Sequence, residues 1–161
     1  MFQYDYVGNL TLITDPRNYQ THNTYDARNR KLTTIEAYLT SLAETTTWHY
    51  DATNNIYQID RPDGTQETKA YDALNRVLSD TVPKSASPNI SLTTWFTYNP
   101  SGTIWKITDA RASGPGDPNY TTSFTYDASD RKIKMSYPGG SNQQWSYDDA
   151  GNLKRVLRFG E

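Results

Sequence analysis

The 161-residue chain contains no cysteine, and its sixteen Lys and Arg side chains nearly balance its eighteen Asp and Glu side chains. The missing cysteine excludes disulfide bonds and thiolate metal ligands. Because no stretch concentrates charge of one sign, we expect neither nucleic acid nor a membrane surface as a partner. The chain also lacks a long apolar run, so we expect no membrane span and no signal peptide.

Strong helix formers such as leucine and alanine are scarce as well, whereas residues typical of strands and turns are abundant. The chain has 13 Tyr, 4 Trp and 4 Phe together with many Thr, Asn and Asp. This composition favours short strands joined by tight turns. Residues 38–44 alone have a helical character, enough for a turn or two at most. We therefore predict an all-β fold.

A tyrosine followed by an acidic or amide residue recurs seven times, with a minimal spacing of 21 residues. The pairs are Tyr4-Asp5, Tyr25-Asp26, Tyr50-Asp51, Tyr71-Asp72, Tyr98-Asn99, Tyr126-Asp127 and Tyr147-Asp148. A fixed period of this kind predicts a repeat array whose units pack on their neighbours. We expect a single array of about seven repeats over residues 1–161, starting near residues 4, 25, 50, 71, 98, 126 and 147.

We number each repeat from its tyrosine, which is position 0. Position +1 is aspartate or asparagine, which suits the first position of a type I turn because its side chain accepts a bond from the backbone two residues on. Position +4 always holds a residue that tolerates the left-handed conformation. These residues are Gly8, Asn29, Asn54, Asn75, Gly102, Asp130 and Gly151. The pattern predicts a hairpin turn in every repeat.

Position −2 carries a second aromatic residue in five of the seven repeats, on the same strand face as the tyrosine. These residues are Phe2, Trp48, Phe96, Phe124 and Trp145, and the exceptions are Asn23 and Lys69. We expect the aromatic side chains to stack as ladders between neighbouring hairpins. The two exceptions would be gaps in those ladders.

Apolar residues with a period of two follow each turn and predict the second strand of the hairpin. The pair Ser79-Asp80 weakens this pattern in the fourth repeat. Proline-containing return turns then follow at Pro16, Pro62 and Pro138. Three repeats carry extra length at this end, in residues 36–45, 83–92 and 110–120, so the insertions should lie along one rim of the sheet.

The repeats resemble those of the YD-repeat, or rearrangement-hotspot (RHS), family. The resemblance rests on Y-D-x-x-G-N-L at residues 4–10 and 147–153, Y-D-A-L-N-R at residues 71–76 and P-D-G-T at residues 62–65. It covers nearly the whole chain, and its recurrence in register makes it specific.

The resemblance implies a curved sheet of antiparallel hairpins that forms an arc of a hollow shell. In bacterial polymorphic toxins and insecticidal toxin complexes such a shell encapsulates a C-terminal toxin domain, and teneurins use a similar barrel at the cell surface. The implied partners are further YD repeats of a parent chain and an enclosed domain, and the implied location is secreted or on the cell surface. The self-cleaving segment of cargo-carrying members has no match here, so the resemblance supplies no catalytic residue and no cofactor.

Three other hypotheses compete with this structural one. Trp95 and Trp105 lie out of phase with the aromatic ladder, so they are candidates for a sugar-stacking surface in a carbohydrate-binding module. His22 and His49 are the only histidines, but their different offsets from the tyrosine argue against a zinc site. A hydrolase with a hidden carboxylate pair would need the Tyr-Asp pairs to converge, whereas their spacing places them on successive hairpins. We also expect open edge strands to promote self-association.

Overall fold

The structure is a computed structural model that describes residues 1–86 and 89–160. Within these residues it contains fourteen β-strands and no helix. Each strand is antiparallel to its neighbour wherever the pairing register is described. The strands are β1 (Phe2–Tyr4), β2 (Leu10–Thr14), β3 (Gln20–Tyr25), β4 (Lys31–Glu36), β5 (Glu44–Tyr50), β6 (Ile56–Asp60), β7 (Gln66–Tyr71), β8 (Val77–Ala86), β9 (Asn89–Tyr98), β10 (Ile104–Thr108), β11 (Thr121–Tyr126), β12 (Lys132–Ser136), β13 (Asn142–Tyr147) and β14 (Leu153–Phe159).

The repeat positions coincide with the strand boundaries. Every position 0 tyrosine is the last residue of an odd-numbered strand, and every position +6 residue is the first residue of the next strand. All seven +4 residues have a positive φ, between 56° at Asp130 and 94° at Gly102. The predicted all-β array of antiparallel hairpins is therefore confirmed.

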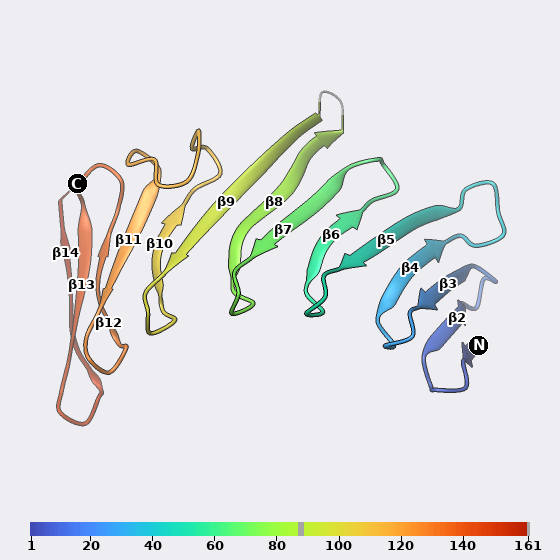
Figure 1. Cartoon of the computed structure of the whole chain (residues 1–161), viewed down its shortest axis with the longest axis horizontal. Coiled ribbons are helices and arrows are strands. Elements are labelled where there is room, and N and C mark those ends of the chain that lie inside the picture. The colour runs from blue at the N-terminus through green and yellow to red at the C-terminus, as the bar shows by residue number, and fades with distance from the viewer. Residues whose placement is uncertain (87–88, 161) are drawn as a thin grey trace. The chain divides into compact units, whose positions relative to one another are not determined.

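The chain divides into two compact units, and each has its own run of hairpins (Figure 1). Unit 1 comprises Met1–Asn75 and Val82–Ser91, and in it β1 to β7 each pair with the next strand in the chain. Unit 2 comprises Arg76–Thr81 and Leu92–Glu161, and in it β9 to β14 pair in the same way. Strands β8 and β9 contribute residues to both units.

Burial is shallow in both units. Among the described residues, Phe124 is the one hydrophobic residue that counts as buried, at 9% exposure, and no large side chain is fully buried. The other buried residues, Asn23, Thr65 and Thr108, are polar. A single sheet without a covering layer has this distribution, because each side chain is shielded only by its neighbours on the same face. Hydrogen bonds and contacts between hairpins must therefore supply much of the stability.

Two local expectations were wrong. Residues 38–42 form turns and not a helical turn, because Ala37 and Leu39 adopt positive φ values of 50° and 63°, and Glu44 already belongs to β5. Ser79-Asp80 does not weaken its strand, since β8 is ten residues long and Thr81 bonds Thr93 of β9 at 2.8 Å. Much of the predicted insertion at residues 83–92 is therefore strand, and Ser87 and Pro88 lie outside the described residues. Residues 110–120 do form a loop, between β10 and β11.

Candidate functional site

The +1 aspartates hold the hairpin turns closed. Oδ1 of Asp26 accepts bonds from the backbone N–H groups of Arg28 at 2.8 Å and Arg30 at 3.0 Å. Oδ1 of Asp127 accepts equivalent bonds from Ser129 at 3.0 Å and Arg131 at 2.9 Å. The bond from the backbone N–H of the +5 arginine is the largest of several that lower the pKa of each of these two carboxyl groups. These groups are thus acceptors within their own turns, on separate hairpins.

Asp5, Asp51, Asp72 and Asp148 occupy the same place in their own turns. Oδ1 of each accepts at least one backbone N–H within its turn, at 2.8 to 3.1 Å. The pKa values of Asp5 and Asp148 are lowered chiefly by the side-chain amides of Asn9 and Asn152. Asn99 replaces the aspartate in the fifth repeat, where its Nδ2 donates to Thr103 Oγ1 at 2.9 Å.

The position 0 tyrosines connect one hairpin to the hairpin before it. Each hydroxyl donates to the backbone carbonyl oxygen of the preceding repeat's +6 residue. The bonds are Tyr25 to Leu10 at 3.0 Å, Tyr50 to Lys31 at 2.8 Å, Tyr71 to Ile56 at 2.8 Å, Tyr98 to Val77 at 2.8 Å, Tyr126 to Ile104 at 2.9 Å and Tyr147 to Lys132 at 2.9 Å. Tyr4, on the first strand, is 60% exposed. The regular offset means that the tyrosine fixes the register between successive hairpins.

The +5 residue provides a second link when it is arginine. The guanidinium carbon of Arg30 lies 4.4 Å from the centre of the Tyr50 ring, Arg76 lies 4.4 Å from Tyr98, and Arg131 lies 4.7 Å from Tyr147. In the first and third cases the same guanidinium also bonds its own +1 aspartate, as in the 2.7 Å contact between Arg30 Nε and Asp26 Oδ2. A cation held against a ring face stabilises the pair by about 0.5–1 kcal/mol at an exposed site.

In unit 1 the +5 side chain reaches further, to the +4 residue of the next turn. Asn9 Nδ2 donates to Asn29 Oδ1 at 3.0 Å, and Asn55 Nδ2 donates to Asn75 Oδ1 at 2.8 Å. Arg30 Nη1 donates to Asn54 Oδ1 at 2.8 Å. The +4 asparagines therefore serve both as left-handed turn residues and as acceptors between turns.

The position −2 residues do not form the stacked aromatic ladder that the sequence led us to expect. The ring pairs that the structure resolves are His22 with Tyr38 and His49 with Tyr57. Lysines lie near three of the five −2 rings instead. Lys132 Nζ is 4.7 Å from the centre of the Phe124 ring and 5.8 Å from that of Trp145, and Lys31 Nζ is 5.5 Å from that of Trp48. These three rings therefore contact a cation and not a neighbouring ring.

The two expected gaps in the ladder have polar partners. Asn23 is 4% exposed, and its amide donates to the Leu10 carbonyl at 3.0 Å and accepts the Thr34 hydroxyl at 2.7 Å. Lys69 Nζ lies 2.9 Å from Glu67 Oε1. The Leu10 carbonyl thus accepts bonds from both Asn23 and Tyr25.

The two candidate sugar-stacking residues lie in different surroundings. Trp95 is half-buried on β9, where it pairs opposite Thr108. Trp105 is 47% exposed at a bulge in β10, with Lys106 Nζ 4.2 Å from the centre of its ring. Trp105 also lines a pocket of about 370 Å³ with Phe124, Tyr126 and Asp130. The structure therefore leaves one of the two rings available to a ligand.

The histidines and the remaining carboxylates form no metal centre in the described part of the chain. His22 stacks on Tyr38 with 4.6 Å between ring centres, whereas His49 Nε2 contacts Asp60 Oδ2 at 2.6 Å. No helix in the described residues is long and apolar enough to span a membrane.

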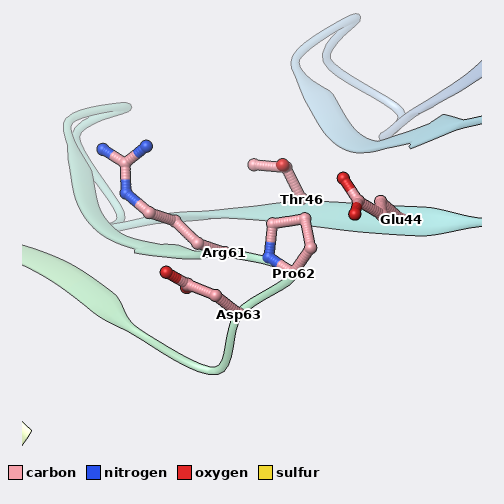
Figure 2. Close-up of a pocket in the computed structure, with 5 residues that line it drawn as sticks. All are labelled: Glu44, Thr46, Arg61, Pro62 and Asp63. Atoms are coloured by element: carbon pink, nitrogen blue, oxygen red, sulfur yellow. The ribbon is translucent and has the colours of Figure 1, made fainter. Parts of the chain in front are cut away.

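A second pocket, of about 320 Å³, lies in unit 1 beside the β6–β7 return turn (Figure 2). Figure 2 shows Glu44 and Thr46 from β5 opposite the turn residues Arg61, Pro62 and Asp63. Arg61 Nη2 contacts Glu67 Oε2 at 2.6 Å, and Asp63 Oδ1 accepts bonds from the Thr65 backbone N–H and hydroxyl. The charged groups of the turn, Arg61 and Asp63, therefore already have partners within the chain.

Sequence reasoning missed the tyrosine hydroxyl bonds and the +5 arginine contacts. The signal was present, since an arginine follows the +4 position in the second, fourth and sixth repeats. What it contacts lies in the next hairpin, so one repeat read alone does not reveal it.

Comparison with known proteins gives a match in structure but not in sequence. No family model matches the chain, and no curated protein is significantly similar to it in sequence. The crystal structure of TcdB2–TccC3–Cdc42 is similar with a TM-score of 0.79 at 13% identity, and that of TcdB2–TccC3 without its hypervariable C-terminal region has a TM-score of 0.78 at 14% identity. The Photorhabdus luminescens Tc holotoxin pore with a mutated TccC3 has a TM-score of 0.75.

The first two matches cover 99% of this chain but 9% of each neighbour. This chain therefore has the fold of a short stretch of a much longer toxin-complex protein. At such low identity the likeness concerns the fold alone.

Proposed function

We propose that this chain is a structural segment of a larger YD-repeat shell, which encapsulates or displays another domain, and that it has no catalytic activity of its own. The observation that carries the proposal is the structural match, in which nearly the whole chain superposes on a 9% stretch of the TcdB2–TccC3 chains. The repeat motifs, which resemble those of shell proteins, are independent support. If the proposal holds, the parent protein acts outside the cell or at its surface.

Exposed side chains on the two edge strands support the proposal that further repeats adjoin this segment. On β1, the N-terminal edge of unit 1, Phe2 is 61% exposed and Tyr4 is 60% exposed. On β14, the C-terminal edge of unit 2, Leu153 is 57% exposed and Phe159 is 44% exposed. Exposed apolar side chains on a strand with one unpaired side are typical of a surface that another strand covers.

The repeated residues would keep such a wall in register. In this proposal the +1 aspartates and +4 residues close each turn, and the position 0 tyrosines join it to the previous hairpin. A wall built in this way has no free strand edge between its hairpins, so it separates an enclosed domain from solvent and from its targets.

The shell role can be tested by expressing the complete reading frame that contains this segment. We expect a protease to cleave any enclosed domain slowly in the intact protein and rapidly once the shell is unfolded in denaturant. Equal cleavage rates before and after unfolding would contradict encapsulation.

The edge strands can be tested on the chain itself by light scattering over a tenfold concentration range. We expect a concentration-dependent dimer or larger assembly. The double variant Phe2→Lys with Phe159→Lys should remain monomeric, because charged edge residues oppose strand pairing. A wild-type chain that stays at 18.4 kDa throughout would show that the edges need no neighbour.

A carbohydrate-binding module is the second candidate, because the exposed Trp105 ring lines an open pocket. Titration of oligosaccharides should then change tryptophan fluorescence in the wild-type chain and not in a Trp105→Ala variant. A flat response in both chains would eliminate this candidate.

A further inference from the structure

The space above a position 0 tyrosine ring is a cation site in three hairpin pairs. The preceding repeat's +5 arginine lies there in each case, and the distances from guanidinium carbon to ring centre are 4.4, 4.4 and 4.7 Å. In the best-described case, Arg30 also donates to Asn54 Oδ1 at 2.8 Å and contacts the Asp51 carbonyl at 3.4 Å. We call this space the guanidinium slot: in the Tyr50 repeat it is made of the tyrosine ring, the +1 carbonyl and the +4 side chain, whereas the Tyr98 and Tyr147 repeats have glycine at +4 and share the ring contact.

The guanidinium slot at Tyr126 has no arginine to occupy it. The preceding +5 residue is Thr103, whose hydroxyl bonds back into its own turn with Asn99 at 2.9 Å and Ser101 at 3.2 Å. No cation lies over the Tyr126 ring among the residues that the structure describes. A pocket of about 370 Å³ lies here, between the β9–β10 turn and the β11–β12 turn.

This pocket has an acidic side chain at the +4 position, which the three slots occupied by arginine lack. Asp130 is the +4 residue of the Tyr126 repeat and lines the pocket. The corresponding residue of the Tyr50 repeat is Asn54, whose side-chain oxygen accepts a hydrogen bond from Arg30. Asp130 offers a full negative charge in place of that neutral amide. Tyr126 and Asp130 line the same pocket, where burial raises the pKa of the Tyr126 phenol and the negative charge of Asp130 raises it further. Trp105 and Phe124 complete an apolar side.

We propose that the guanidinium slot at Tyr126 binds an arginine side chain from a partner polypeptide. The guanidinium would lie over the Tyr126 ring, bond the Asp130 carboxylate and donate to the Asp127 carbonyl, as Arg30 does in its own slot. Arginine fits better than lysine because its planar group can stack on a ring and bond at its edge at the same time. A saccharide matches this slot less well than an arginine. The equivalent slots at Tyr50, Tyr98 and Tyr147 each hold an arginine, and Lys106 already lies against the Trp105 ring on which a sugar would stack. This inference does not rest on the shell proposal.

The test titrates the peptide acetyl-Gly-Gly-Arg-Gly-Gly-amide into the isotopically labelled chain and follows the amide and indole N–H resonances by NMR. We expect saturable shifts at Thr103, Trp105 and Asp130 that weaken as salt is raised. The same peptide with citrulline in place of arginine keeps the shape without the charge, and it should bind at least about fivefold more weakly. No saturable shift up to about 10 mM peptide, or equal binding of both peptides, would overturn the proposal.

Two variants locate the binding. Thr103→Arg should fill the guanidinium slot from within the chain and abolish peptide binding, while Thr103→Val should leave it intact. Asp130→Asn should weaken binding about fivefold, while the exposed control Asp149→Asn should not change it. Binding that survives Thr103→Arg, or that falls equally in Asp130→Asn and Asp149→Asn, would contradict the assignment. An oligosaccharide that shifts these resonances when the peptide does not would favour the carbohydrate alternative instead.

Discussion

The turns of unit 1 are linked to one another by side chains, whereas each turn of unit 2 lacks either the acceptor or the donor for the same link. In unit 1 the +4 residues that accept are Asn29, Asn54 and Asn75. In unit 2 Gly102 and Gly151 have no side chain that could accept a bond. Asp130 could accept one, but the +5 residue of the preceding repeat is Thr103, whose short side chain bonds Asn99 in its own turn. Asparagine supplies both the left-handed conformation and an acceptor, whereas glycine supplies only the conformation. One position can thus close a turn and join it to the next turn.

The largest effect should come from removing both roles of a +4 residue at once. Asn54 has a φ of 73° and accepts the Arg30 bond. We expect Asn54→Ala to lower the free energy of unfolding by about 2 kcal/mol, from left-handed strain and from the lost acceptor. Asn54→Gly should recover roughly half of this loss, because glycine relieves only the strain. Urea denaturation measures both, and equal stability of the two variants would show that strain has no part in the effect.

The next effect concerns the tyrosine hydroxyl. Tyr50→Phe removes the 2.8 Å bond to the Lys31 carbonyl but keeps the ring under Arg30. We expect a loss of about 1 kcal/mol, together with faster amide hydrogen exchange between β4 and β5. Tyr4→Phe is the matched control, since Tyr4 is 60% exposed, and it should change stability by less than about 0.5 kcal/mol. Equal losses in the two variants would count against a link between hairpins.

Unit 2 can be given the missing acceptor. A Cβ atom built on Gly151 would lie 3.5 Å from Arg131 Nη1, so an asparagine there has a donor within reach. We expect Gly151→Asn to be more stable than Gly151→Ala by roughly 1 kcal/mol in thermal or urea unfolding, because alanine has the strain of a φ of 86° without a new bond. Equal stabilities would mean that Arg131 does not use the acceptor.

The smallest effect is a difference in acid sensitivity among the turns. The pKa values of Asp26 and Asp127 are lowered by backbone and side-chain bonds, so their contribution to stability is complete above the ordinary carboxyl pKa of 3.8 and is lost as the pH falls through the lowered folded-state pKa. The β9–β10 turn has Asn99 in this place and does not titrate. NMR of the turn amides between pH 6 and pH 2.5 should show the Ser129 and Arg131 resonances moving as Asp127 is protonated at the acid end of this range, while the amides of the β9–β10 turn do not respond. Asn99→Asp should make the fifth turn acid-sensitive, and an unchanged response would contradict this explanation.

The carbohydrate and cation hypotheses show how far a sequence pattern can identify a site. Trp105 stood out because it was out of phase, and the structure places it beside a pocket. Neither Thr103 nor Asp130 was noticeable alone, because threonine is common in the chain and aspartate tolerates the left-handed turn. Their importance emerges only when the slot at Tyr126 is compared with the slots that Arg30, Arg76 and Arg131 fill.

The local structure of this protein can be predicted from its residues. The seven tyrosines, the turn residues at +1 and +4 and the alternation after them were enough to predict antiparallel hairpins, because turn geometry depends on residues that are close together in the chain. The contacts between hairpins could not be predicted in this way. The predicted aromatic stacking was replaced by hydroxyl-to-carbonyl bonds and by cations on ring faces, since those contacts depend on how one hairpin is offset from the next, and that offset is not encoded within any single repeat.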